Sequence, residues 1–145
     1  MHFDIVVGSV LGASEYVAEA LQATAEEAGH KATCHFEPTL ADISAERTLV
    51  VCTSTHGAGD LPDNIQAFAN DLKSLDMTNF SVLIVGLGDS SYDTYCGAAI
   101  QMEELLSKQK ATLLTPALHI DVLHHPIPED TAVEWFTKFL SSSES

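Results

Sequence analysis

The chain has 145 residues, a formal net charge of −15 at pH 7 and 46% hydrophobic residues. This length and this hydrophobic content predict one folded domain over residues 1–145, and they exclude a disordered chain. The excess of acidic residues argues against nucleic acid as a partner, because binding to phosphate backbones requires a basic surface.

Membrane spans and secretion are also not expected. No apolar run approaches the roughly 18 residues that crossing a bilayer requires, and the first residues lack the charged and apolar segments of a secretory signal. The cysteines, at positions 34, 52 and 96, are odd in number and widely spaced, which favours free thiols in a reducing compartment. We expect a monomer in the cytoplasm.

Strand and helix patterns alternate along the first half of the chain. A strand is predicted at residues 3–7 and a helix at about 14–28, with its apolar residues on one face and Gly29 placed to end it. A weaker strand is predicted at 31–36. Residues 48–53 form a nearly unbroken apolar run, which is typical of a parallel strand covered on both faces.

The alternation continues in the second half. A helix is predicted to begin near Asp63, followed by a strand at 81–85 and a helix at about 98–108. A last strand is predicted over 112–123, where Pro116 favours an interruption because proline has no backbone N–H to donate.

A final helix is predicted to open at Pro128, with Val133, Phe136 and Leu140 as its apolar stripe. Five strands that alternate with helices predict an α/β fold. We expect a three-layer sandwich, in which a five-stranded parallel sheet of order 2-1-3-4-5 carries helices on both faces.

Three loops at predicted strand ends point to a ligand site. They cover residues 8–14, 54–62 and 86–97, after the first, third and fourth predicted strands. In open parallel sheets, ligands bind beyond the carboxyl ends of the strands, near the point where the strand order reverses. All three loops would lie at that edge, which predicts a site for a phosphorylated, planar cofactor, and we expect flavin mononucleotide (FMN).

The first loop has the composition of a phosphate site. It joins a strand to a helix N-terminus, where exposed N–H groups and the helix dipole attract an anion. Ser9 and Ser14 add hydroxyl donors, and Gly12 permits close approach of the backbone. Neither the lysine of triphosphatase loops nor the GxGxxG spacing of dinucleotide sites is present, so a mononucleotide phosphate is favoured. The alternative is a plain tight turn with Ser14 near a helix cap.

The other two loops supply rings that suit a flat heterocycle. His56 is placed to cover one face of a ring, and Gly57 can adopt either sign of φ, so its peptide can flip. Tyr92 stands among small and polar residues, and aromatic stacking beneath a heterocycle contributes about 1–3 kcal/mol. The alternatives are a loop histidine without a role and a partly buried tyrosine anchor.

The three loops resemble the FMN loops of flavodoxins, and of the flavodoxin-type domains of sulfite and cytochrome P450 reductases. The motifs are Ser9-Val10-Leu11-Gly12-Ala13-Ser14, Ser54-Thr55-His56-Gly57-Ala58-Gly59-Asp60 and Gly86-Leu87-Gly88-Asp89-Ser90-Ser91-Tyr92. Leu61-Pro62-Asp63-Asn64 and Ile127-Pro128-Glu129-Asp130 extend the resemblance across the chain, to short members that stand alone. The resemblance implies a flavodoxin-like fold that binds FMN.

The resemblance also implies roles for single residues. Residues 9–14 would bind the FMN phosphate, and backbone groups of Asp89 and Cys96 would meet the pyrimidine edge of the flavin. Tyr92 would stack on the outer face of the isoalloxazine and His56 would take the inner face. The carbonyl of Gly57 would accept a hydrogen bond from N5–H of the one-electron-reduced flavin.

The full predicted cofactor site is Ser9, Val10, Leu11, Gly12, Ala13, Ser14, Ser54, Thr55, His56, Gly57, Ala58, Gly59, Leu87, Gly88, Asp89, Tyr92, Tyr95, Cys96 and Gly97. Three of these depart from the family pattern. Leu11 and Ala13 stand where many flavodoxins carry Thr and Asn, which predicts fewer phosphate donors. His56 replaces a Trp or Tyr, which predicts a pH-sensitive contact with the flavin. Neither a catalytic residue nor a metal ligand is predicted.

By resemblance, the chain is a one-electron carrier that takes electrons from a flavodoxin reductase. Its acceptor would be an iron–sulfur enzyme, with biotin synthase as the candidate, and both partners would present basic surfaces to its acidic one. Two alternatives stay open. One is an NAD(P)H-dependent flavin or quinone reductase, although 145 residues leave no room for a nicotinamide domain. The other is an interaction module with a vestigial flavin site.

Overall fold

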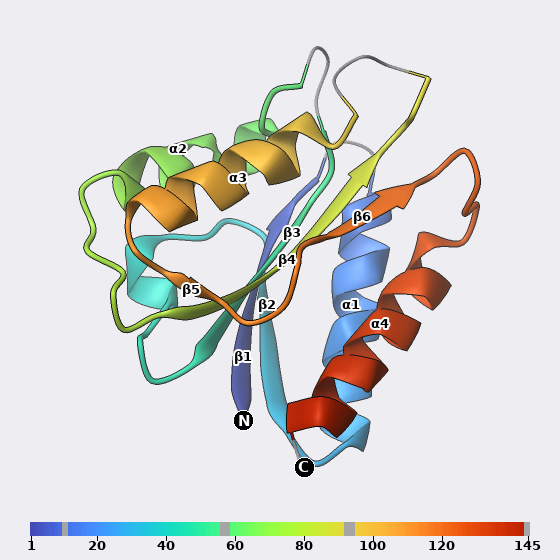
Figure 1. Ribbon diagram of the computed structural model, residues 1–145, viewed down its shortest axis with the longest axis horizontal. Helices are drawn as coiled ribbons and strands as arrows, with labels where there is room; N and C mark the ends of the chain where they lie inside the picture. Colours follow the sequence, from blue (N-terminus) through green and yellow to red (C-terminus); the bar gives the residue numbers. More distant parts are fainter. Residues whose placement is uncertain (10–11, 56–58, 92–94, 144–145) are drawn as a thin grey trace.

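A computed structural model of the chain describes residues 1–9, 12–55, 59–91 and 95–143. Within these residues, strands and helices alternate as predicted (Figure 1). The strands are β1 (His2–Gly8), β2 (Lys31–His35), β3 (Thr48–Thr53), β4 (Ser81–Gly88), β5 (Thr112–Leu113) and β6 (Leu118–Asp121). The helices are α1 (Ala13–Glu27), α2 (Asp63–Leu72), α3 (Gly97–Lys108) and α4 (Pro128–Ser143), with a short 3₁₀ helix η1 (Leu40–Asp42).

The paired strands are parallel and follow the order β2-β1-β3-β4-β5, which confirms the predicted order. β1 lies between β2 and β3, since Phe3 pairs with Ala32 of β2 and with Thr48 of β3. After β2 the chain therefore crosses β1 to continue on the other side. This reversal places the carboxyl ends of β1 and β3 side by side at the position where open α/β sheets bind ligands.

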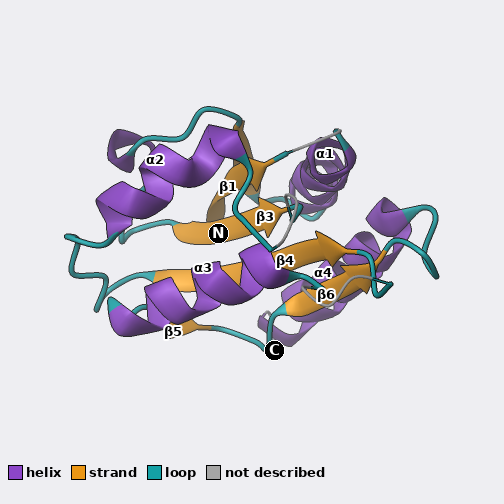
Figure 2. Cartoon of the chain, turned by 90° about the horizontal axis from the view of Figure 1, so that it is seen from above, coloured by secondary structure: helices purple, strands orange, loops and turns teal. Residues whose placement is uncertain are grey.

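The fold has three layers, with α1 and α4 on one face of the sheet and α2 and α3 on the other (Figure 2). Because side chains alternate along a strand, Ile5 and Val7 pack toward α1 and α4, whereas Val6 packs toward α2 and α3. Every position of β3 is buried, which accounts for its unbroken apolar run. No described helix is both long and apolar enough to cross a membrane.

The helices bury the side chains that their spacing predicts: Val17, Leu21 and Ala25 in α1, Ile65, Phe68 and Leu72 in α2, and Ala99, Met102 and Leu106 in α3. In α4 the prediction needs one correction. Phe136 and Leu140 are buried, but Val133 is only half-buried and Ala132 takes the inward position. α4 packs against α1, and the small side chain of Ala132 suits this close contact.

Helix α1 ends at the predicted glycine. Gly29 has a φ of 88°, in the left-handed region that glycine adopts at little cost. Its N–H donates to the carbonyl of Glu26 at 3.1 Å, and the N–H of His30 donates to the carbonyl of Ala25 at 2.9 Å. This pair of bonds is the Schellman motif, which turns the chain directly into β2.

The last predicted strand is divided into β5 and β6, with Pro116 in the connection. Leu113 pairs with Val82 of β4, and Leu118 pairs with Val85. Leu113 and Leu118 are thus five positions apart, whereas their partners on β4 are only three positions apart. The surplus residues loop out where proline cannot donate a ladder hydrogen bond, so the sheet gains a sixth strand.

Candidate functional site

The ends of β1 and β3 are joined by hydrogen bonds at the first loop. The carbonyl of Gly8 accepts the hydroxyl of Ser14 at 2.6 Å and the N–H of Ser54 at 2.9 Å. Ser14 is fully buried, and its oxygen accepts the hydroxyl of Ser54 at 3.2 Å. The Ser14 hydroxyl proton is thus committed to Gly8, and the group that Ser14 offers to a phosphate is its backbone N–H.

Gly12 turns the loop into α1. It has a φ of 88°, and an added Cβ would meet no atom within 4 Å. The N–H of Gly12 donates to Oγ of Ser9 at 3.0 Å, and its carbonyl accepts the N–H groups of Glu15 and Tyr16. The N–H groups of Ala13 and Ser14, in the first turn, have no intrahelical acceptor, and they stand at the positive end of the helix dipole.

Thr55 connects the second loop to the third. Its hydroxyl donates to the carbonyl of Leu87 at 3.4 Å and accepts the N–H of Ala98 at 3.3 Å. The two loops also touch through glycine backbone, since a Cβ on Gly97 would lie 2.9 Å from Cα of Gly59. Together these contacts hold the ends of β3 and β4 and the start of α3 in one fixed arrangement.

The third loop folds back on itself. A Cβ on Gly88 would lie 2.6 Å from the backbone nitrogen of Cys96, so only glycine permits this approach. Cys96 is buried and has a φ of 52°. The carboxylate of Asp89 accepts the N–H and the hydroxyl of Ser91 at 2.8 and 2.6 Å, so it braces the turn. Tyr95 packs edge-on to the His119 ring, with centroids 6.3 Å apart.

At neutral pH the thiol of Cys96 and the phenol of Tyr95 in the third loop are uncharged, whereas Asp121 of the adjacent β6 is ionised. Burial raises the pKa of Cys96 to about 11. Burial, together with Cys96 and Asp121, raises the pKa of Tyr95 to about 12. Hydrogen bonds from Ser90 lower the pKa of Asp121, whose Oδ1 accepts the N–H of Ser90 at 3.3 Å and that of Leu123 at 3.0 Å.

The described part of the predicted site therefore lies at one edge of the sheet, where Ser9 contacts Gly12, Ser14 contacts Ser54, and Thr55 and Gly59 contact the third loop. The other predicted residues, Val10, Leu11, His56, Gly57, Ala58 and Tyr92, lie outside the described residues, and their roles stay predictions. None of the described residues groups into a set of three or more His, Cys, Asp or Glu side chains that could hold a metal ion.

One residue of this edge was missed as a site residue. Asn64, on α2, accepts the N–H of Ser9 at 3.0 Å and donates to the carbonyl of Val7 at 2.6 Å. Sequence reasoning places it after the third predicted strand but assigns it no contact with the first loop. An asparagine in the first turn of a helix has no local pattern that would reveal bonds to residues more than fifty positions away.

The chemistry of the edge suits a phosphorylated mononucleotide. The donors near Gly12 are neutral backbone and hydroxyl groups at a helix N-terminus, which is a common setting for phosphate. The three loops contain no lysine or arginine. The open space beside Gly12 and the glycine contacts between the other two loops leave backbone groups, rather than side chains, to meet a ligand.

Comparisons with known proteins agree with this geometry. The sequence profile of the family described as "Flavodoxin" matches residues 5–136. The chain is 41% identical to the "Protein MioC homolog" of Haemophilus influenzae, over 97% of each chain. It is 38% identical to "Flavodoxin YqcA" of Escherichia coli, over 90% of this chain and 91% of the relative. A cysteine mutant of a flavodoxin from Pseudomonas aeruginosa superposes with a TM-score of 0.90 at 30% identity, covering 100% of both chains.

Proposed function

The chain belongs to the flavodoxin family, and from this premise we propose that it binds FMN and carries single electrons between partner proteins. The observation that supports the proposal most directly is the meeting of the three loop regions at one sheet edge. Ser14 contacts Ser54, and Thr55 contacts both Leu87 and the start of α3. A single nucleotide placed at this edge would be within reach of all three.

The phosphate would lie at the start of α1. The N–H groups of Ala13 and Ser14 would donate to it, and the hydroxyl of Ser9, which already accepts the Gly12 N–H, would add its proton. With neutral donors only, the helix dipole supplies the favourable field. The flavin ring would extend toward Thr55 and Cys96, in the second and third loops.

When bound, FMN supplies the redox chemistry by accepting and returning one electron at a time. The protein contributes position and electrostatics. Acidic side chains border the edge, including Asp60, Asp63, Asp89 and Asp121, and a carboxylate about 10 Å away disfavours an added negative charge by roughly 0.4–1.7 kcal/mol before screening by salt. The protein would therefore make the fully reduced cofactor a stronger electron donor.

The proposed partners are a flavodoxin reductase as donor and an iron–sulfur enzyme, such as biotin synthase, as acceptor. Family resemblance suggests both, and the net charge of −15 supports partners with basic docking surfaces. Opposite charges accelerate diffusional encounter, and the acceleration falls as salt rises. The proposed setting is the cytoplasm, where the three free cysteines stay reduced.

The test is a visible absorption spectrum of the purified protein with added FMN, followed by stepwise reduction with dithionite. A bound flavin that is reduced in two separate one-electron stages supports the proposal. NADPH added alone distinguishes a carrier from an enzyme, because rapid bleaching without a reductase indicates an NAD(P)H-dependent flavin reductase. A protein that stays colourless and takes up no flavin refutes both functions.

A further inference from the structure

Asn64 joins three segments that are distant in the sequence. Its Oδ1 accepts the N–H of Ser9 at 3.0 Å, and its Nδ2 donates to the carbonyls of Val7 at 2.6 Å and Phe36 at 2.9 Å. The amide thus uses its acceptor and both donors. The reversed orientation would set its oxygen against two carbonyl oxygens, so these partners fix the orientation.

From Ser9 the hydrogen bonds lead to the start of α1. Oγ of Ser9 accepts the N–H of Gly12 at 3.0 Å, and the hydroxyl of Ser14, the second residue of the helix, donates to the carbonyl of Gly8 at 2.6 Å. Asn64 therefore binds both neighbours of Gly8, which are Val7 in β1 and Ser9 in the first loop. The position of Ser9, and through it that of Gly12, therefore depends on the Asn64 amide.

We propose that Asn64 is a positioning residue for the phosphate of FMN, which acts through Ser9 and does not touch the cofactor. This inference rests on the proposed function. Because Asn64 takes the N–H of Ser9, that N–H is not a phosphate donor. The phosphate then depends on N–H groups farther along the loop, including those of Ala13 and Ser14, whose placement follows from Gly12.

Few other side chains can replace this amide. A leucine of similar size would leave the N–H of Ser9 and the carbonyls of Val7 and Phe36 without their partner. Aspartate would set a negative charge against both carbonyls and beside the proposed anion site. Asn64→Leu is therefore the variant that removes the hydrogen bonds alone, and Asn64→Asp is the variant that adds charge.

Gln66 offers a matched control on the same helix. Its Nε2 donates to the carbonyl of Leu61 at 3.1 Å and to the carboxylate of Asp63 at 3.3 Å. Gln66→Leu therefore also removes amide hydrogen bonds near the start of α2, but it leaves the partners of Asn64 in place. The experiment measures dissociation constants for FMN and for riboflavin, which lacks the phosphate, by the quenching of flavin fluorescence.

We expect Asn64→Leu to weaken FMN binding by about tenfold, the factor that corresponds to the net worth of roughly one hydrogen bond to the misplaced phosphate. Riboflavin binding should weaken by less than about threefold, so the FMN preference falls. Asn64→Asp should lower the preference further, and Gln66→Leu should leave it unchanged. Equal weakening of both flavins by Asn64→Leu, or no weakening, would overturn the inference while the proposed function stands. A wild-type protein that binds neither flavin would overturn both.

A measurement on the wild-type protein covers the case of variants that do not fold. The Ser9 amide proton should exchange slowly in the flavin-free protein, because Asn64 accepts it. On the change from bound riboflavin to bound FMN, the NMR resonances of the Ala13 and Ser14 amides should move more than that of Ser9. A Ser9 resonance that moves most would show its N–H on the phosphate and would refute the proposal.

Discussion

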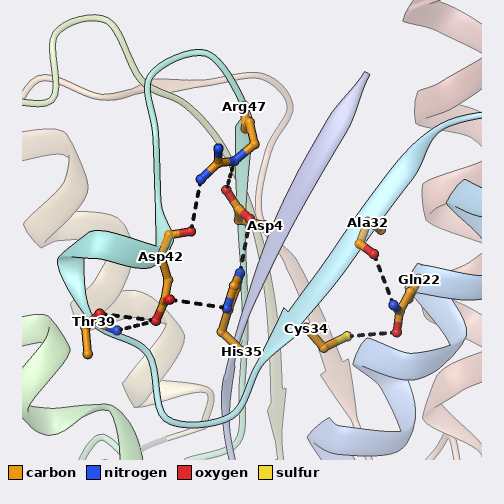
Figure 3. A network of polar contacts seen from close by, with 8 residues as sticks. All are labelled: Asp4, Gln22, Ala32, Cys34, His35, Thr39, Asp42 and Arg47. Carbon is orange, nitrogen blue, oxygen red and sulfur yellow. Dashed lines mark hydrogen bonds and ion pairs between the residues drawn. The ribbon is translucent and has the colours of Figure 1, made fainter.

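The carboxylate of Asp4 accepts a 2.6 Å hydrogen bond from Nε of Arg47, a residue 43 positions away (Figure 3). The Asp4 side chain is only 4% exposed, within strand β1 between β2 and β3, and its other oxygen lies 3.1 Å from Nε2 of His35. Arg47 also donates to the carbonyl of Asp42. One buried carboxylate therefore links β1, β2 and the segment that enters β3.

Arg47→Leu should destabilise the fold because it removes the charged partner of a buried carboxylate. We expect a loss of about 2–4 kcal/mol, less than the roughly 3–5 kcal/mol of a fully buried pair, because the Arg47 side chain is 33% exposed. Denaturation by urea measures the loss. The double variant Asp4→Leu/Arg47→Leu should cost less than the sum of the two single variants.

The control for this ion pair is Lys138→Ala. Lys138 and Glu134 are 3.4 Å apart, and both side chains are more than 70% exposed, so the change should cost less than about 0.5 kcal/mol. If Arg47→Leu and Lys138→Ala lowered the free energy of unfolding by similar amounts, the burial of Asp4 would not contribute to the strength of its ion pair.

Gly12→Ala and Gly29→Ala form a matched pair of tests. Both glycines have a φ of 88°, and an added Cβ would meet no atom at either position. Each variant should lose about 1–2 kcal/mol in urea denaturation, from backbone strain alone. FMN titrations should separate them, since only Gly12 lies at the proposed phosphate site. Equal FMN affinities would argue against that location.

Asp121→Asn should make the free energy of unfolding less dependent on pH in the acidic range. Hydrogen bonds from Ser90 lower the pKa of Asp121 below its ordinary 3.8, so the native state favours the ionised carboxylate. This stabilisation is complete above pH 3.8 and is lost as the pH falls through the lowered pKa. The difference in unfolding free energy between wild type and Asp121→Asn should therefore be larger at pH 7 than at pH 3. A constant difference would contradict the role of the charge.

The cysteine thiols should react slowly with iodoacetamide in the folded protein. Burial raises the pKa of Cys34 to about 11 and that of Cys96 to about 11, against an ordinary 9.0, and burial also raises the pKa of Cys52. At pH 8, a pKa near 11 leaves about a hundredfold less thiolate than an ordinary thiol has. Cys34 should react first because it is the least buried. Mass spectrometry of the native and guanidinium-unfolded protein checks both statements.

The strands and the inward faces of α1, α2 and α3 could be predicted because they depend on local patterns. Residues 48–53 form an apolar run that only a strand covered on both faces requires, and the spacing of Val17, Leu21 and Ala25 fixes the inward face of α1. The division of the last strand at Pro116 was also expected. The inward position of Ala132 was not, because contact with another helix decides the rotation of α4.

The hydrogen bonds that shape the candidate site could not be predicted in the same way. Asn64 reaches Ser9 across 55 positions, and Asp4 reaches Arg47 across 43. Neither residue breaks a pattern strongly, since one aspartate in an apolar strand and one asparagine in a first helical turn are both common. These partners come together only when the chain folds. The glycines and serines of the first loop, by contrast, indicate a turn from the sequence alone.

The interruption at Pro116 also affects how the protein behaves at high concentration. A long, flat outer strand displays unpaired N–H and C=O groups, which recruit strands from other molecules and begin aggregation. β5 has two residues and β6 has four, with a bend between them. This border of the sheet is therefore too short and too irregular to act as a template for edge-to-edge association.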